Sequence, residues 1–158
     1  MKEKNRKPYV WAILLTEAVG ALSGWLSKGG MRLYSDTVSQ PPLSPPSWLF
    51  PIVWGILYAL MGISAARIYL SPPSPERSRG LNLYVLQLIV NFFWSLIFFN
   101  AQAFLFAFFW LMFLWLLVLG MIFLFYRTGP LAGKLQIPYL LWLSFAAYLN
   151  LGVWYLKR

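Results

Sequence analysis

The side chains best suited to chemistry in this sequence are indoles, phenols and amides repeated along apolar stretches. Trp54, Tyr58 and Met61 follow one another at intervals of four and three residues, which places them on one face of a helix. Gln87 and Asn91, followed by a tryptophan, repeat that spacing in a later stretch that is otherwise apolar. Such faces could line a cavity, or they could simply pack.

A third face of this kind lies near the end of the chain, where Trp142, Ala146, Leu149, Asn150 and Val153 fall together. Side-chain amides in apolar surroundings must find partners or water, so the amides of all three stretches are expected to turn inward. They could line a cavity, or they could form hydrogen bonds that only hold helices together. The sequence leaves both interpretations open.

Several classes of active site are excluded by the residue types present. The sequence contains no cysteine and no histidine, which excludes a disulfide framework, a thiol nucleophile, a Cys/His zinc site and a His-based catalytic triad. With so few acidic residues, paired carboxylates or a carboxylate-bound metal are not expected. We predict no catalytic residue for a conventional enzyme, no metal and no required cofactor. The acidic residues are Glu3, Glu17, Asp36 and Glu76.

Glu17 is the acidic residue that falls inside an apolar stretch, which makes it a candidate functional group by default. It could be protonated, or it could hydrogen-bond an inward amide such as Gln87 or Asn91. The same stretch carries a ridge of small residues with GxxxG spacing, which marks close helix packing within one chain or between two. The ridge consists of Thr16, Gly20 and Gly24.

The composition indicates a membrane protein. Hydrophobic residues make up 60% of the 158 residues and charged residues 11%, whereas soluble domains average about 45–50% and about 25%. The nine tryptophans exceed what aromatic belts at the membrane surface would need. The net charge of +9 comes from Lys and Arg at the ends of apolar runs, so we expect a lipid bilayer as partner and no nucleic acid.

The apolar runs predict an all-α membrane protein, a bundle of five transmembrane helices forming a single domain over residues 1–158. A hydrocarbon core of about 30 Å needs about 20 helical residues. No charge occurs from Leu81 to Tyr126, and because this stretch is too long for one crossing we divide it at Asn100-Ala101-Gln102. The expected spans are about 9–27, 48–70, 81–99, 103–126 and 135–156, with a long loop at 28–47.

The long loop and the basic residues bear on how the bundle sits in the membrane. The proline-rich run 40–46 makes the second half of the loop semi-rigid and non-helical, like a lid or platform. By the positive-inside rule the N-terminus is expected inside, and the C-terminus and the loop outside. Of the 13 Lys and Arg residues, all then lie inside except Lys28, Arg32, Lys157 and Arg158.

Several ordered segments make the chain resemble a known family. It is similar, nearly end to end, to the tryptophan-rich sensory protein family, TspO, also called translocator protein or peripheral-type benzodiazepine receptor. The segments that carry the resemblance are Arg32-Leu33-Tyr34, Pro45-Pro46-Ser47-Trp48 followed by residues 52–62, Asn91-Phe92-Phe93-Trp94-Ser95 with Phe98-Phe99, and residues 138–150.

The resemblance implies a five-helix bundle, often homodimeric, that binds porphyrins, notably protoporphyrin, and other lipophilic molecules, with cholesterol as a further ligand in vertebrate members. The family's pocket lies between the helices beneath the first long loop. This chain departs from the family at Gln40 and Leu43, where a loop lysine and tryptophan are usual. Carried over by position, the ligand-binding residues are Tyr34, Trp48, Trp54, Tyr58, Asn91, Trp94, Trp142, Ala146 and Asn150.

Three functions are therefore compatible with the sequence. The leading prediction is a membrane receptor, sensor or transporter for protoporphyrin-type tetrapyrroles, whose flat ring suits stacking on indoles. Metal-free porphyrin is favoured over haem because common axial ligands of haem iron are absent. The first alternative is a light-dependent porphyrin-degrading enzyme in which Trp54 and Trp142 donate electrons. The second is a membrane interaction scaffold whose outward loop docks a partner, for which Leu43 is the best support.

Overall fold

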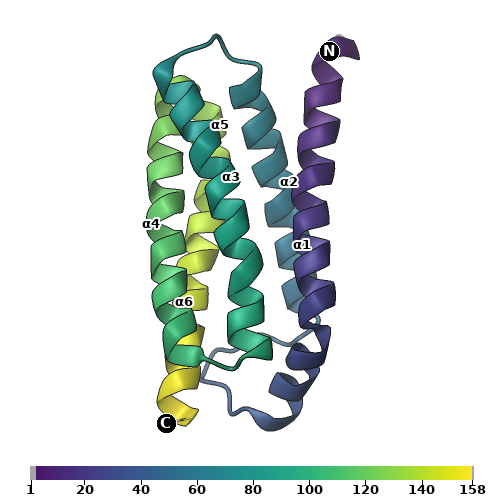
Figure 1. Cartoon of the computed structure of the whole chain (residues 1–158), viewed down its shortest axis with the longest axis vertical. Helices are drawn as coiled ribbons and strands as arrows, with labels where there is room; N and C mark the ends of the chain where they lie inside the picture. The colour runs from purple at the N-terminus through teal and green to yellow at the C-terminus, as the bar shows by residue number, and fades with distance from the viewer. Residues whose placement is uncertain (1–2, 158) are drawn as a thin grey trace.

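The computed structural model describes residues 3–157, which form a bundle of helices running side by side along one axis (Figure 1). No strand occurs within these residues, and five of their helical segments are long and apolar enough to cross a membrane. The predicted all-α, five-span architecture is thus confirmed. The helices are α1 (Glu3–Thr37), α2 (Leu49–Tyr69), α3 (Pro75–Ser95) with the π-helix η1 (Leu96–Asn100), α4 (Phe104–Thr128), α5 (Pro130–Leu135) and α6 (Ile137–Lys157).

The two ends of the bundle differ in what they carry (Figure 1). The N-terminal end holds the start of α1, the turn between α2 and α3, and α5. The opposite end holds the connection between α1 and α2, the short turn between η1 and α4, and the C-terminus. Lys2 and Arg158, which contribute to the charge argument, lie outside the described residues.

The largest departure from the predicted boundaries is the length of α1. It continues to Thr37 rather than ending near residue 27, so the first half of the expected loop is helical and the connection shrinks to residues 38–48. At about 1.5 Å per residue, its 35 residues extend roughly 50 Å, beyond the hydrocarbon core. Gly30 packs against Phe99, where a Cβ would lie 2.6 Å from the Phe99 carbonyl carbon.

The last predicted span, about 135–156, also differs in its start. The helix begins earlier, as the short α5 at Pro130, and α6 follows from Ile137 after a break at Gln136. Pro130 stands in the first turn of α5, where a missing N–H costs nothing. The polar break predicted at residues 100–102 is confirmed, because η1 ends at Asn100 and α4 begins at Phe104.

The turn between α2 and α3 is fixed by local hydrogen bonds. The Ser74 hydroxyl caps α3 by accepting from the Arg77 backbone N–H at 3.0 Å, and Pro75 follows in the first turn. The Arg77 guanidinium donates back to the end of α2, to the carbonyl oxygens of Ile68 (3.2 Å) and Tyr69 (2.7 Å). These bonds satisfy carbonyls that α2 leaves without intrahelical partners.

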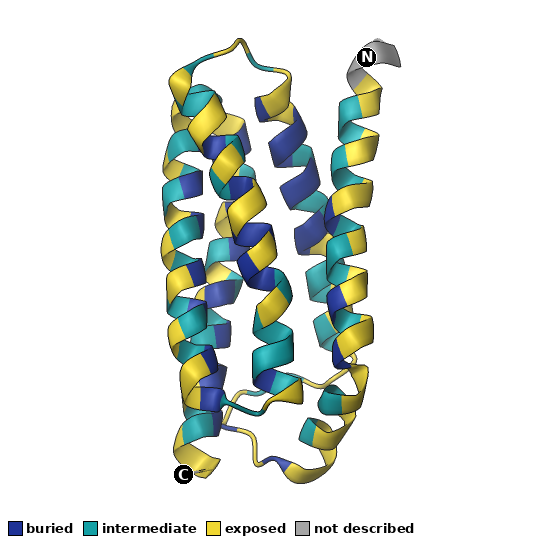
Figure 2. Ribbon diagram, viewed as in Figure 1, coloured by how far each residue is buried: buried dark blue, intermediate teal, exposed yellow. Residues whose placement is uncertain are grey.

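Burial separates an inward and an outward face on each helix (Figure 2). On the ridge of small residues, Thr16 hydrogen-bonds Tyr84 of α3, and Gly20 lies against the ring of Tyr58 of α2. A Cβ at Gly24 would meet no other atom within 4 Å. Thr16 and Gly20 therefore pack against other helices of the same chain. Of the two interpretations of the ridge, packing within one chain rather than between two chains holds at these positions.

Candidate functional site

A hydrogen-bonded chain of phenols and amides joins α2, α3 and α6 in the middle of the bundle. The Tyr58 hydroxyl donates to Asn91 Oδ1 (2.9 Å), and Asn91 Nδ2 donates to the hydroxyl of Tyr139 (2.6 Å). The Tyr139 hydroxyl in turn donates to Gln87 Oε1 (2.7 Å), and Gln87 Nε2 lies 3.9 Å from the sulfur of Met61. The amides of α3 therefore tie three helices together, the structural role that the sequence left open.

Aromatic rings surround this chain on the side of α2 and α6. The ring of Trp54 stacks on Tyr58 with centroids 5.4 Å apart, and it meets Trp142 edge to face at 6.4 Å. Trp142 also contacts Phe50 at 5.8 Å. Its indole Nε1 is buried and has no hydrogen-bond partner. We call Trp54, Tyr58, Asn91, Tyr139 and Trp142 the central cluster.

The space beside the central cluster is small. A cavity of about 10 Å³ lies there, roughly enough for one water molecule. Pockets for drug-sized ligands measure about 300–1,000 Å³. The central cluster is therefore closed in this structure, and a large ligand would have to separate helices. The cavity is lined by Trp54, Asn91, Trp94, Leu111, Leu114, Leu143 and Ala146.

A second aromatic group lies nearer the C-terminal end, where η1 presents its rings. Trp94 stacks on Phe98 with centroids 5.0 Å apart, and Tyr34 of α1 packs on the same ring at 5.3 Å. Trp94 Nε1 donates to Asn150 Oδ1 (3.1 Å), and Asn150 Nδ2 donates to the Phe104 carbonyl (2.8 Å). Tyr34 thus reaches the central cavity indirectly, through Phe98 and Trp94.

The proline-rich connection is held against α6. The Tyr148 hydroxyl donates to the Pro42 carbonyl (2.7 Å), and Pro41 packs so closely on Gly152 that a Cβ there would lie 2.7 Å from the proline Cβ. The Ser44 N–H donates to the Pro41 carbonyl (3.3 Å), which closes a turn. Leu43 occupies that turn with φ at 70°, a left-handed conformation that non-glycine residues seldom adopt.

The structure brings most, but not all, of the predicted ligand-binding residues together. Trp48 does not join them, since it stands at the start of α2 with 65% of its surface exposed. Four of the predicted residues line the cavity: Trp54, Asn91, Trp94 and Ala146. Two others, Tyr58 and Trp142, do not line it but pack against the ring of Trp54. The remaining two, Tyr34 and Asn150, belong to the second aromatic group.

Glu17 is half-buried on α1. The hydrogen-bond partners of Gln87 and Asn91 are Tyr139, Tyr58 and Met61. A hydrogen bond between Glu17 and one of these amides, one of the two alternatives that the sequence left open, is therefore not formed in this structure.

Tyr139 is the residue of the site that the sequence argument missed. It is 1% exposed and its hydroxyl holds both amides of α3. The helical spacing contained the signal, because Tyr139 stands three and seven residues before Trp142 and Ala146 and so shares their face. The leucines from α4 that line the cavity gave no such signal, since α4 is apolar all round.

Comparison with known proteins shows the family of this chain. The model of the TspO/MBR family matches residues 12–156. The protein CrtK of Rhodobacter capsulatus is 36% identical over 87% of this chain and 85% of its own length. The tryptophan-rich protein TspO of Chlorobaculum tepidum is 34% identical (86% and 87% covered), and the translocator protein of Sus scrofa is 34% identical (93% and 90%).

Proposed function

Because the chain belongs to the TspO/MBR family, we propose that this multi-pass membrane protein is a receptor, sensor or transporter that binds a porphyrin, such as protoporphyrin, or a related lipophilic molecule between α2, α3 and α6. Relatives named translocator and tryptophan-rich sensory protein support the general class. We place the N-terminus inside and the C-terminus outside, on the distribution of Lys and Arg. The resemblance to the family also predicts a homodimer and a sterol ligand, and both remain predictions.

The observation that carries this proposal is the meeting of Trp54 and Trp142 across α2 and α6. Their rings touch edge to face, and the Trp142 N–H lies buried without an acceptor. A flat aromatic ligand sliding between the two helices would exchange these ring contacts for stacking on its own faces. An acceptor atom on that ligand would also satisfy the indole N–H, which lowers the cost of separating the helices.

Binding must overcome the closed state. Since the cavity holds about 10 Å³, the conformation that admits a porphyrin is a minor one, and the apparent affinity is reduced by its population. Asn91 and Tyr139 tie α3 to α6, so the opening that breaks the fewest polar contacts of the cluster runs between α2 and α6. Metal-free porphyrin is the expected cargo, because histidine and cysteine are absent from the sequence.

Tryptophan fluorescence with purified protein and protoporphyrin tests the proposal. Trp142→Phe keeps a ring but removes the N–H, and we expect the dissociation constant to rise about tenfold. Trp11→Phe is the matched control, because Trp11 is 70% exposed on the outer face of α1. An unchanged dissociation constant for Trp142→Phe, or an equal change in both variants, would count against the site. Haem, a bile pigment and a sterol in the same assay define the ligand class.

Light-dependent breakdown of the porphyrin is the second candidate function, favoured by the direct contact of Trp54 with Trp142. An indole beside a bound porphyrin could pass one electron to its light-excited state, which leaves an indole radical cation and a reduced porphyrin radical, and dissolved dioxygen would then be the oxidant for breakdown of the ring. Illumination of the complex, followed through the Soret absorption band, separates this from binding alone. A Soret band that stays constant under light, in protein shown to bind the porphyrin, removes this candidate.

A further inference from the structure

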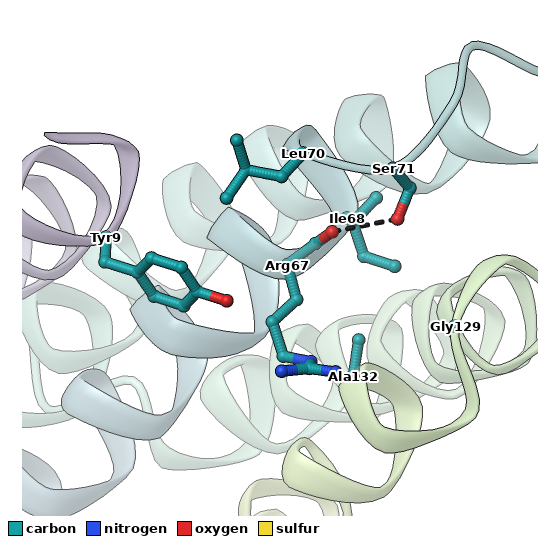
Figure 3. Close-up of a pocket in the computed structure, with 7 residues that line it drawn as sticks. All are labelled: Tyr9, Arg67, Ile68, Leu70, Ser71, Gly129 and Ala132. Atoms are coloured by element: carbon teal, nitrogen blue, oxygen red, sulfur yellow. Dashed lines mark hydrogen bonds between the residues drawn. The ribbon is translucent and has the colours of Figure 1, made fainter. Parts of the chain in front are cut away.

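A cavity lies at the N-terminal end of the bundle, away from the central cluster. Its volume is about 220 Å³, whereas the cavity beside the central cluster measures about 10 Å³. Three separate parts of the chain form it: the start of α1, the end of α2 and the junction of α4 with α5 (Figure 3). We call it the helix-end pocket, and it is lined by Tyr9, Arg67, Ile68, Leu70, Ser71, Gly129 and Ala132.

Arg67 gives the helix-end pocket its chemistry. The side chain leaves the last turn of α2, and its guanidinium lies beside Ala132 (Figure 3). The Arg67 side chain is exposed, and among the described residues its guanidinium has no hydrogen-bond or ion-pair partner, whereas the Arg67 backbone carbonyl accepts from the Ser71 hydroxyl at 2.8 Å. A guanidinium presents a planar fork of donors that suits the oxygens of a phosphate, and this one is accessible to an anion that enters the pocket.

One further donor lies beside Arg67. The Tyr9 hydroxyl points into the space beside the guanidinium (Figure 3), whereas the Ser71 hydroxyl donates to the Arg67 carbonyl. Leu70, which is 40% exposed, adds apolar surface to the same pocket. An occupant should therefore combine an anionic, oxygen-rich group with an apolar portion. That is the make-up of a membrane lipid where its headgroup joins the acyl chains.

The surroundings select for negative charge. Basic side chains outnumber acidic ones at this end of the bundle, where Glu76 is the one carboxylate among the side chains that the structure describes. An excess of Lys and Arg attracts anionic lipids, with about 1 kcal/mol gained per basic residue near the membrane surface. The pocket also lies where the helices end, which is the depth of the headgroups for a bundle that spans the bilayer. The basic residues are Arg6, Lys7, Arg67, Arg77, Arg79, Arg127 and Lys134.

From these observations we propose that the helix-end pocket binds the phosphate of an anionic membrane lipid, with Arg67 as its main ligand and Tyr9 as an additional hydrogen-bond donor. The hydrogen bonds from Arg77 to Ile68 and Tyr69 hold the end of α2 in place, so one wall of the pocket is already ordered. The site is separate from the central cluster, and Arg67→Gln should leave protoporphyrin binding unchanged. Failure of either proposal is therefore distinguishable from failure of the other.

Native mass spectrometry of the full-length protein in detergent, with added phosphatidylglycerol or phosphatidylcholine, tests the site. We expect more phosphatidylglycerol than phosphatidylcholine adducts on the wild type, and a loss of about tenfold in Arg67→Gln. Arg79→Gln is the matched control, since Arg79 is exposed like Arg67 at the same end but does not line the pocket, and it should change binding less than about twofold. Equal losses in both variants, or equal adducts of the two lipids on the wild type, would overturn the proposal.

A second pair of variants separates hydrogen bonding from net charge. Tyr9→Phe keeps the ring and should lower phosphatidylglycerol adducts about threefold, whereas Tyr126→Phe, exposed at the same end, should have no effect. An unchanged adduct level in Tyr9→Phe would contradict the role given to that hydroxyl. A third measurement adds inorganic phosphate to the wild type together with phosphatidylglycerol. A decrease in lipid adducts would show that phosphate and lipid compete for the pocket, which supports recognition of the phosphate group. Arg67-dependent binding of inorganic phosphate without Arg67-dependent lipid adducts would overturn the membrane lipid as ligand.

Discussion

The central cluster and the helix-end pocket use their polar groups in opposite ways. In the central cluster Asn91 and Tyr139 each donate and accept hydrogen bonds beside a cavity of about 10 Å³, although the Trp142 N–H has no acceptor. In the helix-end pocket the Arg67 guanidinium has no partner among the described residues, beside a cavity of about 220 Å³. The first region holds the groups that could recognise a large ligand but must open to receive one. The second has room already and lacks only a counter-charge, so the two regions should respond differently to substitution.

Removing bulk from the central cluster should have the largest effect. Leu143 is fully buried and lines its small cavity, so Leu143→Ala should lower the free energy of unfolding by about 2–5 kcal/mol. The added space should also speed association of protoporphyrin. Unfolding in mixed detergent gives the first quantity, and stopped-flow fluorescence gives the second.

Leu141→Ala is the control, because Leu141 lies on the same helix with 64% of its surface exposed, and it should cost no more than about 0.5 kcal/mol. If both leucine variants lost similar stability, packing beside the central cluster would contribute no more than the exposed face of α6.

Breaking the polar chain should have the next largest effect. Tyr139→Phe leaves Asn91 Nδ2 and Gln87 Oε1 without the partner they share, which should cost about 1–3 kcal/mol in unfolding free energy. Tyr126→Phe, at an exposed position, should change little. Thermal unfolding in detergent compares the two. A stability for Tyr139→Phe equal to that of Tyr126→Phe would mean that the hydrogen bonds do not tie α3 to α6.

A smaller effect is expected at the connection between α1 and α2, residues 38–48, which lies at the end of the bundle opposite the helix-end pocket. Tyr148→Phe removes the bond to Pro42, worth about 1 kcal/mol, and amide exchange in residues 38–48 should then be about fivefold faster. Tyr69→Phe, at the opposite end, should leave that exchange unchanged. Hydrogen–deuterium exchange measures both variants, and equal exchange rates would show that the connection is held by packing alone.

The smallest effect concerns the left-handed turn within that connection. Asparagine adopts a positive φ more readily than leucine, so Leu43→Asn should raise the unfolding free energy by about 0.5 kcal/mol. Leu43→Val is the opposite test, since a β-branched residue suits this conformation less, and it should lower stability. Chemical denaturation of both variants decides the sign, and the reverse order would contradict the turn geometry.

The five membrane spans and their helical type could be predicted because burial in hydrocarbon dominates within each span. Outside the hydrocarbon core that argument loses its force, and this is why the helical continuation of α1 through residues 28–37 was missed. Charges and the Gly29-Gly30 pair indicate a loop, yet Gly30 is held by its packing on η1, which cannot be seen in the sequence.

The candidate site could be predicted only where helical spacing determines which side chains face the interior of the bundle. Trp54, Asn91, Trp94 and Ala146 converge as their spacing indicated, because each stands on an inward face. The closure of the cavity depends on how leucines of α4 fill the centre, which spacing does not reveal. The helix-end pocket was missed for a related reason: its walls come from three segments far apart in the sequence, and Arg67 by itself looks like any basic residue at a helix end.

The short turn between η1 and α4 has a consequence for how the chain enters the membrane. From Leu81 to Tyr126 the sequence carries no charge, and Ala101–Ala103 is all that separates the two crossings. When α3 and α4 enter the membrane as a pair, the turn between them must cross the hydrocarbon core. Because this turn carries amide groups but no ionised side chain, the free-energy barrier to its crossing is low. α3 and α4 can therefore insert together as one hairpin during biosynthesis. The favourable insertion free energy of the strongly apolar α4 then offsets the cost of inserting the more polar α3 with Gln87 and Asn91.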